Sequence, residues 1–124
     1  FSPEPLGPQK FKKEGQQDGF SIRFTANPDI LRTLSHQRRE GQKVLGFAAE
    51  TTPDMDSLLE LARGKRARKD ADLLAGNRVN SGDSGFGAAT NSMAVVDRTG
   101  HEEIWPNQSK ADVAWDLCSW LLRL

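Results

Sequence analysis

The chain has 124 residues, which is enough for one domain with a hydrophobic core. Its 17 Lys and Arg residues balance 17 Asp and Glu residues, and zero net charge disfavours nucleic acid or an anionic membrane as the main partner. One cysteine excludes an internal disulfide and a cysteine-rich zinc site, and the two histidines lie far apart, so we expect no structural metal. No apolar run approaches the roughly 18 residues that span a bilayer, and no signal peptide is visible, so we expect a cytoplasmic protein.

Residues 1–19 are predicted to form a flexible loop, because prolines and glycines recur in them. The chain opens on Phe1-Ser2-Pro3 without an initiator methionine, which indicates a piece cut from a longer protein. Lys10-Phe11-Lys12-Lys13 lies within this loop, and a lysine there could fold over a bound polyanion. Most exposed lysine clusters, however, bind nothing specific.

The next segment predicts a strand, a helix and a second strand. Residues 20–25 alternate apolar and polar side chains, which is typical of a strand with one covered face. Asn27 can cap a helix whose first position is Pro28. The apolar face of this helix is expected to comprise Ile30, Leu31 and Leu34.

The second strand, residues 43–48, contains a glycine and then two alanines before Glu50. A glycine within a strand usually marks a close approach to the backbone, and the approaching group can be a ligand or a packed helix. Thr52-Pro53-Asp54 then starts another helix, which ends in the basic run Arg63–Lys69.

The last third predicts a short strand, a hairpin and a helix. Residues 72–75 form the strand, and a Gly/Ser-rich loop follows at 80–90. Residues 92–97 and 101–105 flank a turn and read as a hairpin, and Ser109 caps the final helix. The apolar stripe of this helix is expected to contain Val113, Leu117, Leu121 and Leu124, widened by Trp115, Cys118 and Leu122.

Strands alternating with helices indicate an α/β, Rossmann-like fold, with a mainly parallel sheet flanked by helices and a C-terminal antiparallel hairpin. Five predicted strands are fewer than a doubly wound domain usually has. We therefore expect residues 1–124 to be the C-terminal portion of a single domain, and hence a partial domain.

Ligands of open α/β sheets bind at the carboxyl ends of the strands, and several predicted features can reach that edge. They are the turn at 27–30, the strand end at 46–50, and the lysines Lys65 and Lys69, which lie four residues apart on one helix face. No nucleophile triad and no glycine-rich phosphate-loop motif is present. The residues alone indicate part of an α/β domain able to bind a phosphorylated ligand.

The order and spacing of these motifs add a resemblance. The motifs are Lys10-Phe11-Lys12-Lys13, Asn27-Pro28-Asp29-Ile30-Leu31, Gly46-Phe47-Ala48-Ala49-Glu50-Thr51, Ala62-Arg63-Gly64-Lys65-Arg66-Ala67-Arg68-Lys69 and Asp72-Leu73-Leu74-Ala75-Gly76-Asn77. In this order they resemble the C-terminal half of bacterial phosphopantothenoylcysteine synthetase, from the pantothenate-metabolism flavoprotein family. In that family the synthetase is commonly fused to an FMN-dependent decarboxylase, so FMN is expected only in that fused domain and not in this chain.

The resemblance implies a ligase of coenzyme A biosynthesis, dimeric at full length, that uses CTP and Mg²⁺. Its substrates are 4′-phosphopantothenate, cysteine and CTP, and its intermediate is an acyl-cytidylate. By position, Lys10 matches a lysine that contacts nucleotide and supports turnover, and Asn77 matches a substrate or loop contact. The other implied nucleotide-binding residues are Pro28, Asp29, Ile30, Leu31, Phe47, Lys65 and Lys69. We expect Lys10, Lys65 and Lys69 to converge beside Phe47 at the carboxyl edge of the sheet.

The sequence departs from the family pattern at two places, where Arg78 and Ala89 stand in positions that are often acidic. The family's glycine-rich phosphate loop is also absent from this chain, so we expect it to have little or no ligase activity alone. Two other interpretations stay open: a non-catalytic interaction domain derived from the same fold, and nucleic-acid binding through residues 63–69, which zero net charge disfavours.

Overall fold

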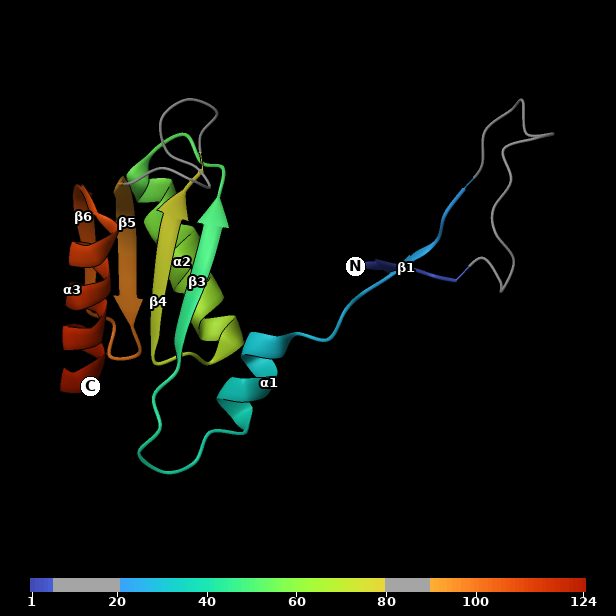
Figure 1. Ribbon diagram of the computed structural model, residues 1–124, viewed down its shortest axis with the longest axis horizontal. Coiled ribbons are helices and arrows are strands. Elements are labelled where there is room, and N and C mark those ends of the chain that lie inside the picture. The colour runs from blue at the N-terminus through green and yellow to red at the C-terminus, as the bar shows by residue number, and fades with distance from the viewer. Residues whose placement is uncertain (6–20, 80–89) are drawn as a thin grey trace.

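In the computed structural model, the described residues are 1–5, 21–79 and 90–124. A four-stranded sheet has the order β3-β4-β5-β6 and comprises Leu45–Glu50, Leu73–Arg78, Thr90–Asp97 and Glu102–Ser109. Three helices accompany it: α1 (Ile30–His36), α2 (Met55–Lys69) and α3 (Lys110–Arg123). Figure 1 shows α2 and α3 on opposite faces of the sheet, with α1 beside the lower part of β3. Among the described residues no helix is long and apolar enough to cross a membrane.

The expected α/β class with a C-terminal antiparallel hairpin is confirmed, but the sheet is mixed and not mainly parallel. β3 and β4 are parallel, whereas the pairings of β4 with β5 and of β5 with β6 are antiparallel. The third parallel strand, expected at 20–25, does not join this sheet. Among residues 21–25, which are the described part of that segment, only Phe24–Thr25 (β2) is a strand, and it pairs with Ser2–Pro3 (β1) apart from the main sheet (Figure 1). Both of its residues are exposed, so alternation alone wrongly predicted a covered face.

Helix starts follow the capping side chains, with one correction. Asp29, not Asn27, caps α1: its Oδ1 accepts from the Arg32 N–H at 3.1 Å, so Pro28 lies before the helix instead of in its first turn. The expected cap of the last helix, Ser109, is confirmed, and Asp54, from the expected start at 52–54, caps α2. Asp54 accepts from the Ser57 N–H at 2.7 Å, and Ser109 accepts from the Asp112 N–H at 3.1 Å.

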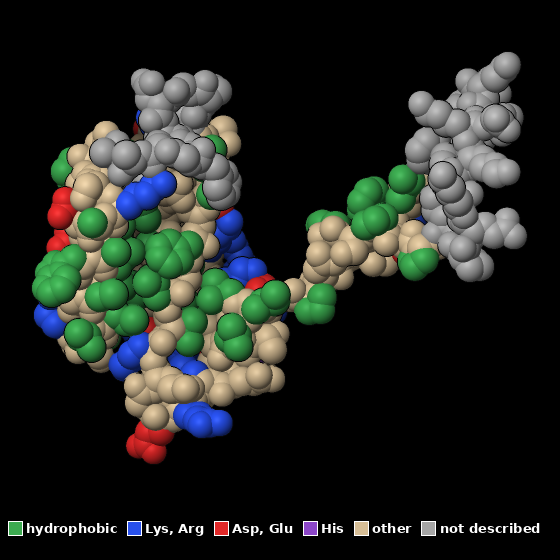
Figure 2. Space-filling model, viewed as in Figure 1, with side chains coloured by type: hydrophobic (Ala, Val, Ile, Leu, Met, Phe, Trp, Pro, Cys, Tyr) green, Lys and Arg blue, Asp and Glu red, His purple; other side chains and the backbone are tan. Residues whose placement is uncertain are grey.

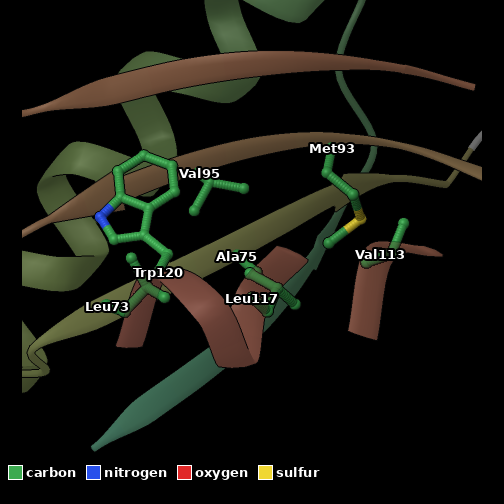
Figure 3. Packing of buried hydrophobic residues seen from close by; sticks show 7 residues of the cluster. All are labelled: Leu73, Ala75, Met93, Val95, Val113, Leu117 and Trp120. Carbon is green, nitrogen blue, oxygen red and sulfur yellow. The ribbon is translucent and has the colours of Figure 1, made fainter. Parts of the chain in front are cut away.

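The face under α3 is a core of large side chains (Figure 3). Its buried members are Leu73, Ala75, Met93, Val95, Val113, Leu117 and Trp120. The expected widening of the helix stripe is wrong, because Trp115 and Leu122 are 76% and 88% exposed and Cys118 is also exposed. Trp120, three residues beyond Leu117, faces the sheet in their place and is 4% exposed.

Among the described residues, the core under α2 and α1 contains two alanines and no aromatic side chain. Ala48, Ala62, Leu74 and Val96 are buried there, with Leu31 and Leu59 packed against them. A Cβ added at Gly46 would lie 2.7 Å from Leu31 Cδ2 and 3.0 Å from Leu74 Cδ1. Of the two interpretations of this glycine, close packing of a helix is therefore the one that the contacts support.

Ion pairs hold the amino end of β4, which is the end opposite the carboxyl edge of the sheet. The Asp72 carboxylate is 1% exposed and accepts from the Val44 N–H at 2.8 Å. Arg98 approaches it at 3.0 Å and Arg38 at 3.5 Å, while both arginines also contact Asp70. Because the buried carboxylate has charged and backbone partners, this cluster joins the loop after α1, the end of α2 and the hairpin turn.

Candidate functional site

Lys65 and Lys69 lie on the flank of α2 that faces β3 and α1. The Lys65 ammonium forms an ion pair with the carboxylate of Glu50, the last residue of β3. The Lys69 ammonium forms an ion pair with Asp29, the cap of α1. Figure 2 shows basic and acidic side chains gathered where α1 meets the sheet. Two lysines one turn apart thus connect α2 to the ends of two other elements.

The carboxylates of Asp29 and Glu50 differ in the groups from which they accept hydrogen bonds. Asp29 uses one oxygen to cap α1, by accepting from the Arg32 N–H, and the other to accept from Lys69. The hydrogen bond from Lys69, followed by the one from Arg32, lowers the pKa of Asp29, so this carboxyl is ionised at neutral pH. The Glu50 carboxylate, at the end of β3, forms an ion pair with Lys65, and the Glu50 side chain is 20% exposed.

The basic run does not present a single charged surface. Arg63 lies on the other flank of α2 and forms a bidentate pair with Glu102 of β6, with N–O distances of 2.9–3.1 Å. Arg66 donates to the Ala71 carbonyl at 3.2 Å, at the C-terminal end of the helix. Lys65 and Lys69 are therefore the members of this run that the structure directs towards β3 and α1.

Phe47 and Asn77 lie on the opposite face of the sheet from these lysines, so the expectation that Lys65 and Lys69 converge beside Phe47 is wrong. In the parallel register, Phe47 stands beside Ala75, which belongs to the core under α3, and Ala49 stands beside Asn77. Phe47 is 65% exposed, since α3 packs mainly over β5 and β6. β3 is the outer strand of the sheet. The two lysines and the pair Phe47 and Asn77 therefore lie near the same edge of the sheet, but on opposite faces.

The remaining predicted residues have different surroundings. Pro28 and Ile30 are exposed beside the cap of α1. Ile30 is 72% and Leu34 is 56% exposed, so the expected apolar face of this helix is wrong for both. Leu31 points inward and packs over Gly46. Lys10 and the glycine-rich loop at 80–89 lie outside the described residues.

The lysines are not equally close to the carboxyl edge of the sheet. α2 begins at that edge and runs back towards the amino ends of the strands (Figure 1), so Lys69 lies farther from the edge than Lys65. A cavity of 360 Å³ lies between α2 and the hairpin turn, and another of 540 Å³ lies beside the loop after α1. Neither is lined by Phe47, Lys65 or Lys69.

The sequence interpretation gave no role to Glu50. The sequence did contain an indication of such a role, since an acid at the end of a predicted strand lies at the carboxyl edge where ligands bind. What the sequence could not supply is the partner, which lies 15 residues later on a helix whose rotation against the strand depends on packing.

The side chains here suit an anion better than a bare metal ion. An ammonium carries three donors, so each lysine can bind phosphate oxygens in addition to its carboxylate. Both carboxylates already hold cations, and within the described ranges no group of three His, Cys, Asp or Glu residues could hold a metal. Mg²⁺ usually binds through substrate phosphates and one or two carboxylates. A Mg²⁺ ion at such a site would therefore arrive bound to the phosphates of its ligand.

Comparison with known proteins places this chain in a family. The model of the DNA/pantothenate metabolism flavoprotein C-terminal domain matches residues 1–124. The Coenzyme A biosynthesis bifunctional protein CoaBC of Bacillus subtilis is 35% identical over 117 residues, which are 94% of this chain and 27% of that protein. Its Escherichia coli counterpart is 33% identical over 106 residues, which are 85% of this chain and 25% of that protein.

Solved structures agree with this match. The crystal structure of the C-terminal domain of CoaBC aligns with a TM-score of 0.60 and 26% identity, over 80% of this chain and 42% of that chain. The DNA/pantothenate metabolism flavoprotein from Streptococcus pneumoniae aligns with a TM-score of 0.63 at 17% identity, over 83% of this chain and 42% of that one, and supports the fold alone. The chain spans about a quarter of the length of the curated relatives it matches. It belongs to the DNA/pantothenate metabolism flavoprotein C-terminal domain family.

Proposed function

We propose that this chain supplies part of the CTP site of a coenzyme A biosynthesis ligase that joins 4′-phosphopantothenate to cysteine. The pathway comes from the relatives, which are named as coenzyme A biosynthesis bifunctional proteins. The observation that carries the site is the pair Lys65 and Lys69, held one turn apart between the end of β3 and the cap of α1. Two ammonium groups at this spacing suit the phosphates of a nucleotide.

The proposed reaction has two balanced steps. The 4′-phosphopantothenate carboxylate attacks the α-phosphorus of CTP, which forms an acyl-cytidylate and releases pyrophosphate. The amino group of cysteine then attacks the acyl carbon, forms the amide, loses a proton and releases CMP. Negative charge develops on phosphate oxygens in the first step, and positioned cations stabilise it without a protein nucleophile.

The proposed role of each residue in binding CTP depends on where the residue lies. Lys65 and Lys69 would hold phosphate oxygens, and backbone and side-chain groups of Pro28, Asp29, Ile30 and Leu31 would border the nucleotide. Phe47, on the opposite face of the same outer strand, offers an exposed ring for stacking on the base. Asn77 lies on that face as well and would contact substrate or a neighbouring loop. Lys10 is proposed as the catalytic lysine.

Several partners belong to this proposal. Mg²⁺ would arrive on the triphosphate and neutralise part of its charge. FMN would bind only to a fused decarboxylase domain, and the full-length protein would act as a homodimer in the cytoplasm. Nothing in the proposal assigns nucleic acid or a membrane as a partner.

Pyrophosphate release by the full-length protein tests this reaction. Release is expected to require CTP, Mg²⁺ and 4′-phosphopantothenate together, and addition of cysteine should convert the acyl-cytidylate to the amide with release of CMP. The present chain alone is expected to show little or no turnover. Near-normal turnover by residues 1–124, or release that does not depend on CTP, would contradict the proposal.

A second candidate function is a non-catalytic interaction domain, and the exposed outer side of α3 favours it. Trp115 and Leu122 are 76% and 88% exposed there. Hydrophobic side chains so placed are typical of surfaces that bind another protein. If this is the function, Trp115→Ala will change the oligomeric state measured by light scattering, and CTP with Mg²⁺ will not bind the chain.

A further inference from the structure

Glu50 and Lys65 form the contact on which this inference depends. The pair joins the end of β3 to the middle turns of α2, and its side chains are 20% and 33% exposed, respectively. An ion pair shielded to this extent is screened less by salt than a fully exposed one, and it restricts a side chain with many rotamers. The lysine therefore has one preferred position before any ligand binds.

We infer that Glu50 is a positioning residue for nucleotide binding, one that holds the Lys65 ammonium where the nucleotide phosphate will lie. The inference rests on the proposed function and adds a residue to it. Its carboxylate accepts one of the three ammonium donors, which leaves two for phosphate oxygens. The rotamer freedom of the lysine is lost on folding, so it is not lost again when the nucleotide binds.

The opposite role for Glu50 makes an opposite prediction. A carboxylate beside a phosphate-binding lysine also repels the phosphate, and if repulsion dominated, removing the charge would tighten binding. Positioning is favoured here because β3 belongs to the sheet and α2 packs against it, with Ala48 at 7% and Ala62 at 2% exposure. The two ends of the pair are thus fixed before binding.

Asp29 is less suited to the same test, although it holds Lys69. One of its oxygens caps α1, so any substitution there also weakens the helix start. Glu50 caps none of the described helices, and the ion pair described for its side chain is to Lys65.

The chain offers a matched control on the same helix. Glu102 of β6 pairs with Arg63 of α2, two residues before Lys65, but on the flank that faces away from β3. Glu102→Gln removes one carboxylate charge from α2, as Glu50→Gln does. Both changes preserve side-chain volume, so a general loss of charge or stability affects the two variants alike.

The test is calorimetric titration of this chain with CTP and Mg²⁺, repeated as CTP kinetics on the full-length protein. Glu50→Gln is expected to weaken CTP binding about fivefold, which is less than the loss expected for a charge-assisted contact made directly to the ligand. In the kinetics, KM for CTP should rise while kcat changes by less than about twofold, because the interaction serves binding. Glu50→Asp should recover part of the affinity, and Glu102→Gln should bind CTP like the unchanged chain.

The double variant shows whether Glu50 acts through Lys65. In a Lys65→Ala background, Glu50→Gln is expected to add less than about twofold, since the group it positions is absent. Equal effects in both backgrounds, tighter binding by Glu50→Gln, or equal losses in Glu50→Gln and Glu102→Gln would each overturn the inference. If Lys65→Ala weakens binding and Glu50→Gln does not, only the positioning role fails. If the unchanged chain does not bind CTP, the proposed function fails with it.

Discussion

The two faces of the sheet differ in the size of the side chains that close them. Under α3, large residues such as Trp120 and Leu117 fill the space against Met93 and Val95. Under α2, small residues such as Ala48 and Ala62 let the helix approach, and Gly46 admits a leucine of α1. Close approach brings the charged flank of α2 to the end of β3. The comparison indicates that the α3 face mainly supplies stability and the α2 face positions the candidate site.

The largest expected effect is on the α3 face. Trp120→Ala removes a side chain that is 4% exposed, which packs at 6.0 Å (ring centroids) from Trp105, and should lower the free energy of unfolding by about 3–5 kcal/mol. Trp115→Ala on the same helix is the control, because Trp115 is 76% exposed and its loss should cost less than about 0.5 kcal/mol. Urea denaturation followed by circular dichroism measures both. Similar losses in the two variants would contradict the assignment of the core.

A second effect of intermediate size tests the hairpin that supports α3. Burial raises the pKa of Asp97, but hydrogen bonds to its carboxylate, from Thr99 and Trp120 side chains and from the Thr99 and His101 N–H groups, outweigh burial and hold the pKa below 3.8. A carboxyl with a lowered folded-state pKa contributes stability above its unfolded pKa, and this contribution is lost as the pH falls through the folded one. Asp97→Asn should therefore lower the free energy of unfolding by about 2 kcal/mol at pH 7.

The pH dependence separates this effect from a general defect. As the pH falls below 3.8, the unchanged chain should lose stability more steeply than Asp97→Asn, so the two unfolding midpoints converge. Denaturant midpoints at several pH values measure the convergence. A difference that stays constant down to the lowest pH would contradict the role of this carboxylate.

The smallest expected effect on stability is on the α2 face. Gly46→Ala places a methyl group against Leu31 and Leu74 and should cost about 1 kcal/mol, at the low end for overpacking, because the end of the Leu31 side chain can turn away. We expect the rest of the strain to shift α1, whose cap Asp29 pairs with Lys69, so CTP affinity should also fall. Ala49→Val, on the other face of the same strand, enlarges an exposed position and should leave both quantities nearly unchanged. Equal effects at the two positions would contradict the close packing of α1.

Sequence reasoning predicted most of the elements, because their signals are local. The strand–helix–strand unit of β3, α2 and β4 and the hairpin of β5 and β6 follow from apolar periodicity and capping residues. The strand at 20–25 was expected to have a covered face, yet a strand needs a partner, and alternation does not reveal which partner is near. Trp115 and Trp120 illustrate the same difficulty on α3, since both are apolar and only one faces the sheet.

The candidate site could be predicted in part. Lys65 and Lys69 share a helix face because they are four residues apart, and the structure places them together. Phe47 and Glu50 are three residues apart on a strand, so their side chains point to opposite faces, and the expected convergence of the lysines beside Phe47 overlooked this period of two. The ion-pair partners could not be predicted, since they depend on how α1 and α2 pack against β3.

Binding of CTP with Mg²⁺ to this chain tests the central claim most directly. Calorimetric titration should show one site whose affinity falls about tenfold or more in Lys65→Ala and in Lys69→Ala, as expected when a charged hydrogen bond to phosphate is lost. Arg63→Ala removes a cation from the opposite flank of α2 and should bind CTP as the unchanged chain does. Equal weakening in all three variants, or unchanged affinity in both lysine variants, would contradict the account.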